Sequence, residues 1–202
     1  MGVMISLSSL LLSDLCKSSI ALGFEGRTGV LLLAAALVLL VLLTHWPLLA
    51  AQAHCFDDAD FIATNPLVTQ PSFKSAWRFL TEVLNPSTVE GYYLPLSMIS
   101  LMLDYAWGGR YDNLRAFHVT SLVLHSLNTV LLFLILYRLF RSRVTAAIAA
   151  ALFAVHPLTI EPLAWIGERK TLLAGFFGCA CVLTYLQSVE QGRRKWLLGS
   201  VV

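Results

Sequence analysis

An apolar run without a single polar residue, from position 30 to 43, most constrains what this chain can fold into. With its flanks the run covers residues 29–51, and about 20 such residues cross the hydrocarbon core of a bilayer. Inside a bilayer the backbone must satisfy its own hydrogen bonds, so the run is predicted to be a helix. Only 13% of the 202 residues are charged, whereas soluble domains carry about 25%. The sequence therefore predicts an integral membrane protein.

Three further apolar stretches predict more membrane-spanning helices. They cover residues 113–140, 144–155 and 171–187. The expected fold class is all-α, a polytopic transmembrane bundle of about four spans. Residues 1–28 are expected to form a cytoplasmic N-terminal segment and residues 29–202 the membrane region. Residues 196–202 have the composition of a fifth span at its beginning.

The stretch at 52–112 is polar enough to form a long loop outside the membrane. Within it, residues 72–84 predict an amphipathic helix, because one face carries the apolar residues Phe73, Ala76, Trp77, Leu80 and Leu84. Such a helix either lies on the membrane surface or packs against the rest of the loop, and both interpretations stay open. Residues 94–107 are apolar but too short to span, so we expect a juxtamembrane or re-entrant helix.

The orientation follows from the basic residues in short loops. Each of the turns at 138–143 and 193–195 holds three Lys or Arg residues and no acid, which predicts that both face the cytoplasm. The segments 52–112 and 156–170 then lie outside, and most acidic residues lie with them. The outer set consists of Asp57, Asp58, Asp60, Asp104, Asp112, Glu161 and Glu168, together with His54, His118 and His156.

Asp57 and Asp58 follow directly after the first span. Adjacent carboxylates repel, so one of them is suited to act as a general base. Carboxylates also bind divalent cations. The alternative is that these acids only keep the outer loop soluble. The net charge of +2 gives no reason to expect a nucleic-acid partner.

Histidines mark the later spans. His118 and His125 are seven residues apart and so share a helix face. They are suited either to haem or metal ligation or to hydrogen bonds between helices. His156 precedes a proline that ends the third span, and a polar connection is expected from 159 to 170. Arg169 near outer carboxylates is suited to bind phosphate.

Several short motifs in a fixed order resemble one family. The chain resembles the N-terminal membrane region of the tetratricopeptide-repeat-containing transmembrane O-mannosyltransferase-like proteins, in particular their bacterial relatives, within the GT-C glycosyltransferase superfamily. The resemblance covers about residues 29–190 and rests on these motifs: Phe56-Asp57-Asp58, Asn65-Pro66, Tyr93-Leu94-Pro95-Leu96, Leu103-Asp104-Tyr105, Phe117-His118, Leu124-His125-Ser126-Leu127-Asn128, the run His156 to Ile166, and the run Glu168 to Leu173.

The resemblance implies an enzyme of the bacterial inner membrane whose site faces the periplasm or exterior. It implies transfer of a sugar, mannose by default, from a polyprenyl-phosphate donor to a Ser or Thr hydroxyl of an exported protein. Asp57 and Asp58 match the family's acidic position in the first outer loop, which serves as catalytic base or metal-associated acid. The expected substrate-binding residues are His118, His156, Glu161, Arg169 and Lys170.

Two departures from the family pattern affect these expectations. Leu94 stands where many members have Arg. Family members also continue with further spans and tetratricopeptide repeats, so a truncated or inactive fragment is expected. A non-catalytic membrane scaffold or lipid-carrier-binding protein and a haem- or metal-binding bundle stay open as alternatives. A divalent cation is the one cofactor to be considered.

Overall fold

A computed structural model describes residues 27–52, 57–83 and 92–191 of the chain. The predicted segment 1–28 lies almost wholly outside these residues, and the predicted beginning of a fifth span at 196–202 lies entirely outside them. The chain divides into two compact units, residues 1–36 and 37–202. The described part of the first unit is the apolar first half of helix α2, Arg27–His45. The paragraphs below concern the second unit.

All the described elements are helical. Helix α2 continues as a 3-10 turn, Trp46–Ala50, whose Pro47 cannot donate an α-helical hydrogen bond. The other long helices are α6, Arg115–Phe140, and α9, Arg169–Gln191. Within the described residues, three segments are long and apolar enough to cross a membrane, namely Arg27–Ala50, Arg115–Phe140 and Ile166–Glu190. The chain is therefore an all-α membrane helical bundle, as its sequence predicts.

The third predicted span is broken rather than straight. Helix α7, Arg143–Ala154, is followed by the 3-10 turn Pro157–Thr159 and by α8, Ile160–Ala164, with a bend of 55° between the two parts. If this bent pair is taken as one span, the described part of the chain contains up to four spans. The segment expected as a polar connection at 159–170 includes the second part of this bent pair. Most of it is helical, with a further 3-10 turn at Ile166–Glu168 before α9.

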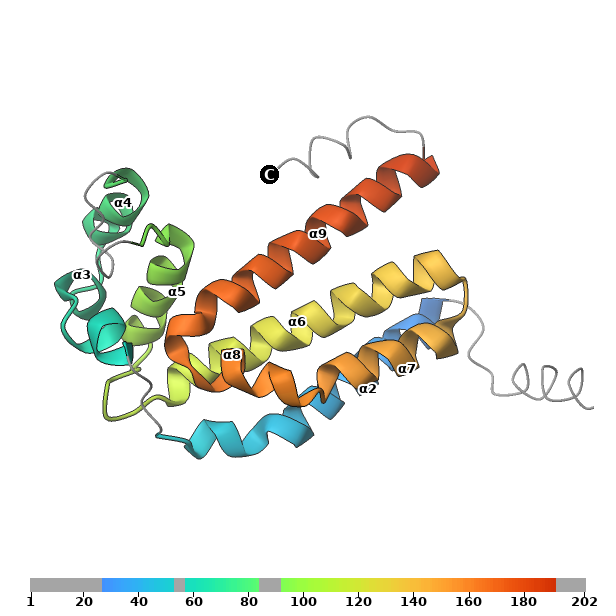
Figure 1. The fold of residues 1–202 in the computed structure, drawn as a ribbon, viewed down its shortest axis with the longest axis horizontal. Coiled ribbons are helices and arrows are strands. Elements are labelled where there is room, and N and C mark those ends of the chain that lie inside the picture. Colours follow the sequence, from blue (N-terminus) through green and yellow to red (C-terminus); the bar gives the residue numbers. More distant parts are fainter. Residues whose placement is uncertain (1–26, 53–56, 84–91, 192–202) are drawn as a thin grey trace, which may run out of the picture. The chain divides into compact units, whose positions relative to one another are not determined.

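Helix α6 lies between α7 and α9 and packs against both (Figure 1). It ends at Phe140, and the backbone of the next residue, Arg141, is left-handed with φ 56°. Ser142 then caps α7 by accepting a hydrogen bond from the Thr145 amide. This tight reversal explains why α7 returns along α6. At the same end Arg138 and Arg141 pair with Glu190 at 3.1 and 3.2 Å.

The loop between the first two long spans forms a small helical unit at the opposite end. It contains a π-helical turn, Ala59–Ala63, and helices α3, Pro66–Thr69, α4, Phe73–Thr81, and α5, Pro95–Ala106. Helix α5 has 12 residues, which confirms that 94–107 forms a short helix and not a full span. The core of this unit is made of Phe61, Ile62, Val68, Phe79, Met98, Leu101, Met102, Leu114, Phe117 and Ile166.

Only part of the apolar face predicted for α4 contacts the core: Ala76 packs against it, and Leu84 lies outside the described residues. Phe79 and Ser75 are its buried side chains, whereas Phe73 is 98% exposed and Trp77 67% exposed. Phe73, Trp77 and Leu80 of the predicted face do not contact the core of the loop unit.

Candidate functional site

The loop that follows the first span meets the turn between α8 and α9. The Nε1–H of Trp165 donates a hydrogen bond to Asp57 Oδ1 at 2.8 Å, and the Gly167 amide donates to Asp58 Oδ1 at 3.1 Å. These contacts join positions more than 100 apart in the sequence. They place two motifs that the sequence singles out separately, Asp57-Asp58 and the 156–170 segment, at the same end of the bundle, as the predicted topology requires.

The two aspartates differ in their surroundings. Asp58 is fully buried, so its carboxylate anchors the loop to the Gly167 amide. Asp57 is half-buried, so part of the residue stays accessible to solvent. A carboxylate with one oxygen held by a hydrogen bond and an open side is suited to take a proton at a defined position.

Gly167 is the residue that lets the loop come so close. A Cβ atom added there would lie 3.0 Å from Asp57 Oδ1 and 3.0 Å from Trp165 Nε1, and 3.2 Å from the ring of Phe61. Both distances of 3.0 Å are tighter than ordinary van der Waals contact. The absence of a side chain at Gly167 therefore permits the Asp57–Trp165 hydrogen bond.

Lys170 brings a positive charge beside this pair. Its Nζ lies 5.9 Å from the ring centroid of Trp165 and 5.9 Å from that of Tyr92, and it pairs with Glu168 at 2.9 Å. Trp165 thus touches the Asp57 carboxylate with its N–H and faces the ammonium with its ring. Lys170 also lines a cavity of about 250 Å³ whose other walls are mainly apolar residues of α5 and α9.

Arg169, the residue expected to bind phosphate, is buried in a polar cluster. It pairs with Asp104 Oδ2 at 2.9 Å, donates to Ser100 Oγ at 2.7 Å, and donates to the Phe117 carbonyl at 2.8 Å. Thr120 donates to the other oxygen of Asp104 at 2.5 Å. Burial raises the pKa of the Asp104 carboxyl, while Arg169 and Thr120 oppose that change. The cluster ties α5 and α6 to the beginning of α9.

The other expected site residues do not gather around Asp57. His118 is buried on α6, near the carbonyls of Leu163 and Ala51. His156 is exposed and caps the 3-10 turn by accepting from the Leu158 amide at 3.3 Å. Glu161 is an exposed residue in the first turn of α8.

Sequence reasoning missed a second histidine contact. The Nε2 atoms of His45 and His125 each lie 3.0 Å from the carbonyl oxygen of Ala154, the last residue of α7. That carbonyl has lost its regular helical partner because the Leu158 amide bonds His156 instead. His125 thus pairs with His45 rather than with His118. Pro157 after His156 was the sequence signal, because a helix that breaks at a proline leaves carbonyls at its end without their helical hydrogen bonds.

Near this contact lies a larger cavity of about 530 Å³ between α6, α7, α8 and α9. Asn128 and His156 are among its lining residues, but its walls are mostly apolar. In the described part of the chain, three or more His, Cys, Asp or Glu side chains do not come together as metal ligands would.

The sequence is similar to several curated proteins. It is 34% identical over 142 residues to the mouse protein named Protein O-mannosyl-transferase TMTC1, and 36% identical over 114 residues to the Drosophila melanogaster protein named Protein O-mannosyl-transferase Tmtc1. It is 27% identical over 169 residues to the human protein named Protein O-mannosyl-transferase TMTC4. These matches cover 67%, 55% and 72% of this chain.

The relatives are much longer than this chain. The matched regions are 15% of the mouse protein, 12% of the fly protein and 23% of the human protein. No protein-family model and no solved structure matches the sequence. This membrane bundle is therefore similar to a small part of each of these relatives, all of which are named protein O-mannosyl-transferases.

Proposed function

We propose that this chain is a membrane-embedded part of a protein O-mannosyl-transferase of the family to which its mouse, fly and human relatives belong. Two findings support the proposal: the similarity extends over about two thirds of the chain, and the chain is a membrane helical bundle. The reaction is transfer of a hexose, mannose by default, to a Ser or Thr hydroxyl of an exported protein. We place the enzyme in the GT-C superfamily, in a bacterial inner membrane, with its site on the outer side.

The observation that carries this proposal is the hydrogen bond of 2.8 Å between Trp165 and Asp57. It fixes a half-buried carboxylate, and we place that carboxylate at the membrane boundary, where a hydroxyl of an exported protein would meet a lipid-linked donor. A hydroxyl is a poor nucleophile until a base removes its proton. Asp57 is that base, and Asp58 is the residue that positions the loop.

The donor is a polyprenyl-phosphate sugar. Its apolar chain suits the mainly apolar cavity between α5 and α9, and its phosphate suits Lys170 at the same cavity. In the reaction the acceptor oxygen forms a bond to the anomeric carbon while the bond from that carbon to the phosphate oxygen breaks. The proton goes to Asp57 Oδ2, and the phosphate leaves with the electron pair. The charge of Lys170 stabilises the departing phosphate.

The remaining expected site residues have supporting roles in this proposal. Arg169 is held by Asp104, Ser100 and Phe117, so it fixes the beginning of α9 and hence the position of Lys170. His118 is buried on α6 near the carbonyls of Ala51 and Leu163, so we propose that it supports the segments that precede Asp57 and Trp165. His156 and Glu161 are exposed at the α7–α8 bend and not beside Asp57, so we propose that they contact a part of the donor or acceptor distant from the reacting atoms.

A transfer assay tests the proposal. Membranes with the full-length gene product receive polyprenyl-phosphate mannose labelled in the sugar and a peptide rich in Ser and Thr, with and without EDTA. We expect label in the peptide, sensitive to mild base as an O-linked sugar is. If EDTA abolishes transfer, the proposed mechanism would include a divalent cation, for which Asp57 is the candidate ligand. Absence of transfer from mannose, glucose and N-acetylglucosamine donors would contradict the proposal.

A further inference from the structure

Helix α4 carries an apolar stripe that the described protein does not cover. Phe73, Trp77 and Leu80 are 98%, 67% and 43% exposed. With 3.6 residues per turn they lie within about 60° of one another around the helix axis. The buried side of the helix, Ser75 and Phe79, faces the core of the loop unit on the opposite side. An exposed stripe of this kind marks an interaction surface.

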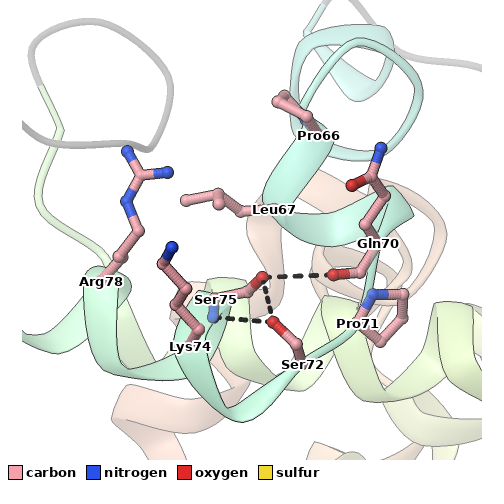
Figure 2. A pocket seen from close by; sticks show the side chains of 8 residues that line it. All are labelled: Pro66, Leu67, Gln70, Pro71, Ser72, Lys74, Ser75 and Arg78. Carbon is pink, nitrogen blue, oxygen red and sulfur yellow. Dashed lines mark hydrogen bonds between the residues drawn. The ribbon is translucent and has the colours of Figure 1, made fainter.

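Two basic residues run along one edge of that stripe. Lys74 and Arg78 follow Phe73 and Trp77 directly, so each lies about 100° further around the helix. Figure 2 shows both side chains extending into the space between α4 and α3, where they line a cavity of about 470 Å³ with Gln70. Arg78 pairs with Glu82 at 2.5 Å, and Lys74 contributes a full positive charge.

The position of α4 in the fold brings this surface close to the membrane boundary. Helix α4 packs on α3 and α5, and α5 in turn packs on α6 and α9, both of which contain membrane-spanning segments. Two other tryptophans at this end are also exposed, Trp46 after α2 at 63% and Trp107 after α5 at 79%. Tryptophan prefers the interface between lipid and water.

We propose that α4 is an interfacial membrane helix that binds the surface of an anionic bilayer. Phe73, Trp77 and Leu80 enter the boundary between headgroups and acyl chains, and Lys74 and Arg78 bind headgroup phosphates at the edge of the cavity. Apolar residues on one face with basic residues beside them are the features by which amphipathic helices bind anionic lipid. This surface is separate from the Asp57 site, and its binding does not depend on the proposed transfer activity.

Spin labels measure the depth of α4 in the full-length gene product. Phe73→Cys and Trp77→Cys are labelled in a background whose native cysteines are serine, and Gln70→Cys serves as the control, because Gln70 is exposed on the opposite wall of the cavity. The protein is reconstituted in nanodiscs of phosphatidylcholine, alone or mixed with phosphatidylglycerol. Collision with oxygen reports lipid, and collision with a water-soluble nickel chelate reports solvent.

We expect labels at 73 and 77 to collide mainly with oxygen and the label at 70 mainly with the nickel chelate. Accessibility of 73 and 77 to the nickel chelate would overturn the proposal. Shielding from both reagents would also overturn it, because another protein segment or a second copy would then cover the stripe.

A charge variant tests the headgroup contact separately. In the double variant Lys74→Gln/Arg78→Gln, the label at 77 should lie shallower than in the parent when phosphatidylglycerol is present and unchanged when it is absent. The control Arg115→Gln removes another exposed positive charge and should leave the depth unchanged. Equal depth in the parent and the double variant in both lipids would overturn the assignment of Lys74 and Arg78.

Discussion

Trp165 Nε1 donates a hydrogen bond of 2.8 Å to Asp57 Oδ1, and so joins the turn before α9 to the loop that follows the first span. The same indole ring lies 5.9 Å from the ammonium of Lys170. One side chain thus sets the spacing between the carboxylate and the positive charge that the proposed transfer requires. The turn at 165–167 is therefore the structural centre of the candidate site.

Replacing Trp165 by Phe keeps the ring and removes its N–H. We expect sugar transfer to fall by about 10- to 100-fold, since a small displacement of a catalytic group has effects of this size. The apparent melting temperature of the purified protein should change little. The control is Trp107→Phe, at a tryptophan that is 79% exposed, and it should retain full transfer. Equal activity of the two variants would contradict the positioning role of Trp165.

Gly167→Ala should separate Asp57 from Trp165 without removing either residue. The new methyl group would meet both partners at 3.0 Å, so the loop must move away and lose about 1–3 kcal/mol of stability. Gly178→Ala is a matched control on α9, because no atom lies within 4 Å of a Cβ added there. Transfer and unfolding measured together should show a loss for Gly167→Ala alone. A fully active Gly167→Ala protein would show that the close approach is dispensable.

The buried Asp104–Arg169 pair should show strong coupling. Removing one partner leaves a buried charge unpaired, which costs about 3–5 kcal/mol. Replacing both, as in Asp104→Leu/Arg169→Met, should cost less than the sum of the single changes. Arg141→Gln, which breaks a pair whose arginine is 76% exposed, should cost less than about 1 kcal/mol. A double-mutant cycle on unfolding in detergent measures the coupling, and additive single effects would argue against it.

His45 and His125 should together stabilise the end of α7, where the third span bends. Both lie 3.0 Å from the Ala154 carbonyl, so either one satisfies it when the other is replaced by Phe. Each single change should cost about 0.6 kcal/mol, the average for hydrogen bonds between membrane helices. The double change leaves a buried carbonyl without a donor, which costs about 1–3 kcal/mol. If the double variant is no less stable than either single variant, the shared carbonyl does not stabilise the bend.

Much of the fold could be predicted because it depends on local composition. Continuous apolar runs specified the spans that contain α2, α6 and α9, and the short run at 94–107 indicated a helix that does not span. The break in the third span was less visible. His156-Pro157 marked the position of the break. The chain becomes helical again after it, where His156 caps the 3-10 turn and α8 buries Leu163.

The site was harder to predict because its contacts join distant segments. Asp57 was selected for its place after a span, yet nothing local indicated that Trp165 would bind it. Arg169 was expected to bind a phosphate because the predicted topology places it on the outer side of the membrane. The structure instead pairs it with Asp104 from α5. A lone acid in an apolar helix requires a partner, and that rule would have suggested such a pair.

The most direct test of the central claim compares Asp57→Asn with Asp60→Asn in the transfer assay. Asp60 lies in the same loop and is exposed, so its replacement makes the same chemical change away from Trp165. We expect Asp57→Asn to lower transfer at least about 100-fold, as loss of a general base does, and Asp60→Asn to leave it unchanged. Equal transfer by the parent and by Asp57→Asn would contradict the assignment of Asp57 as the base.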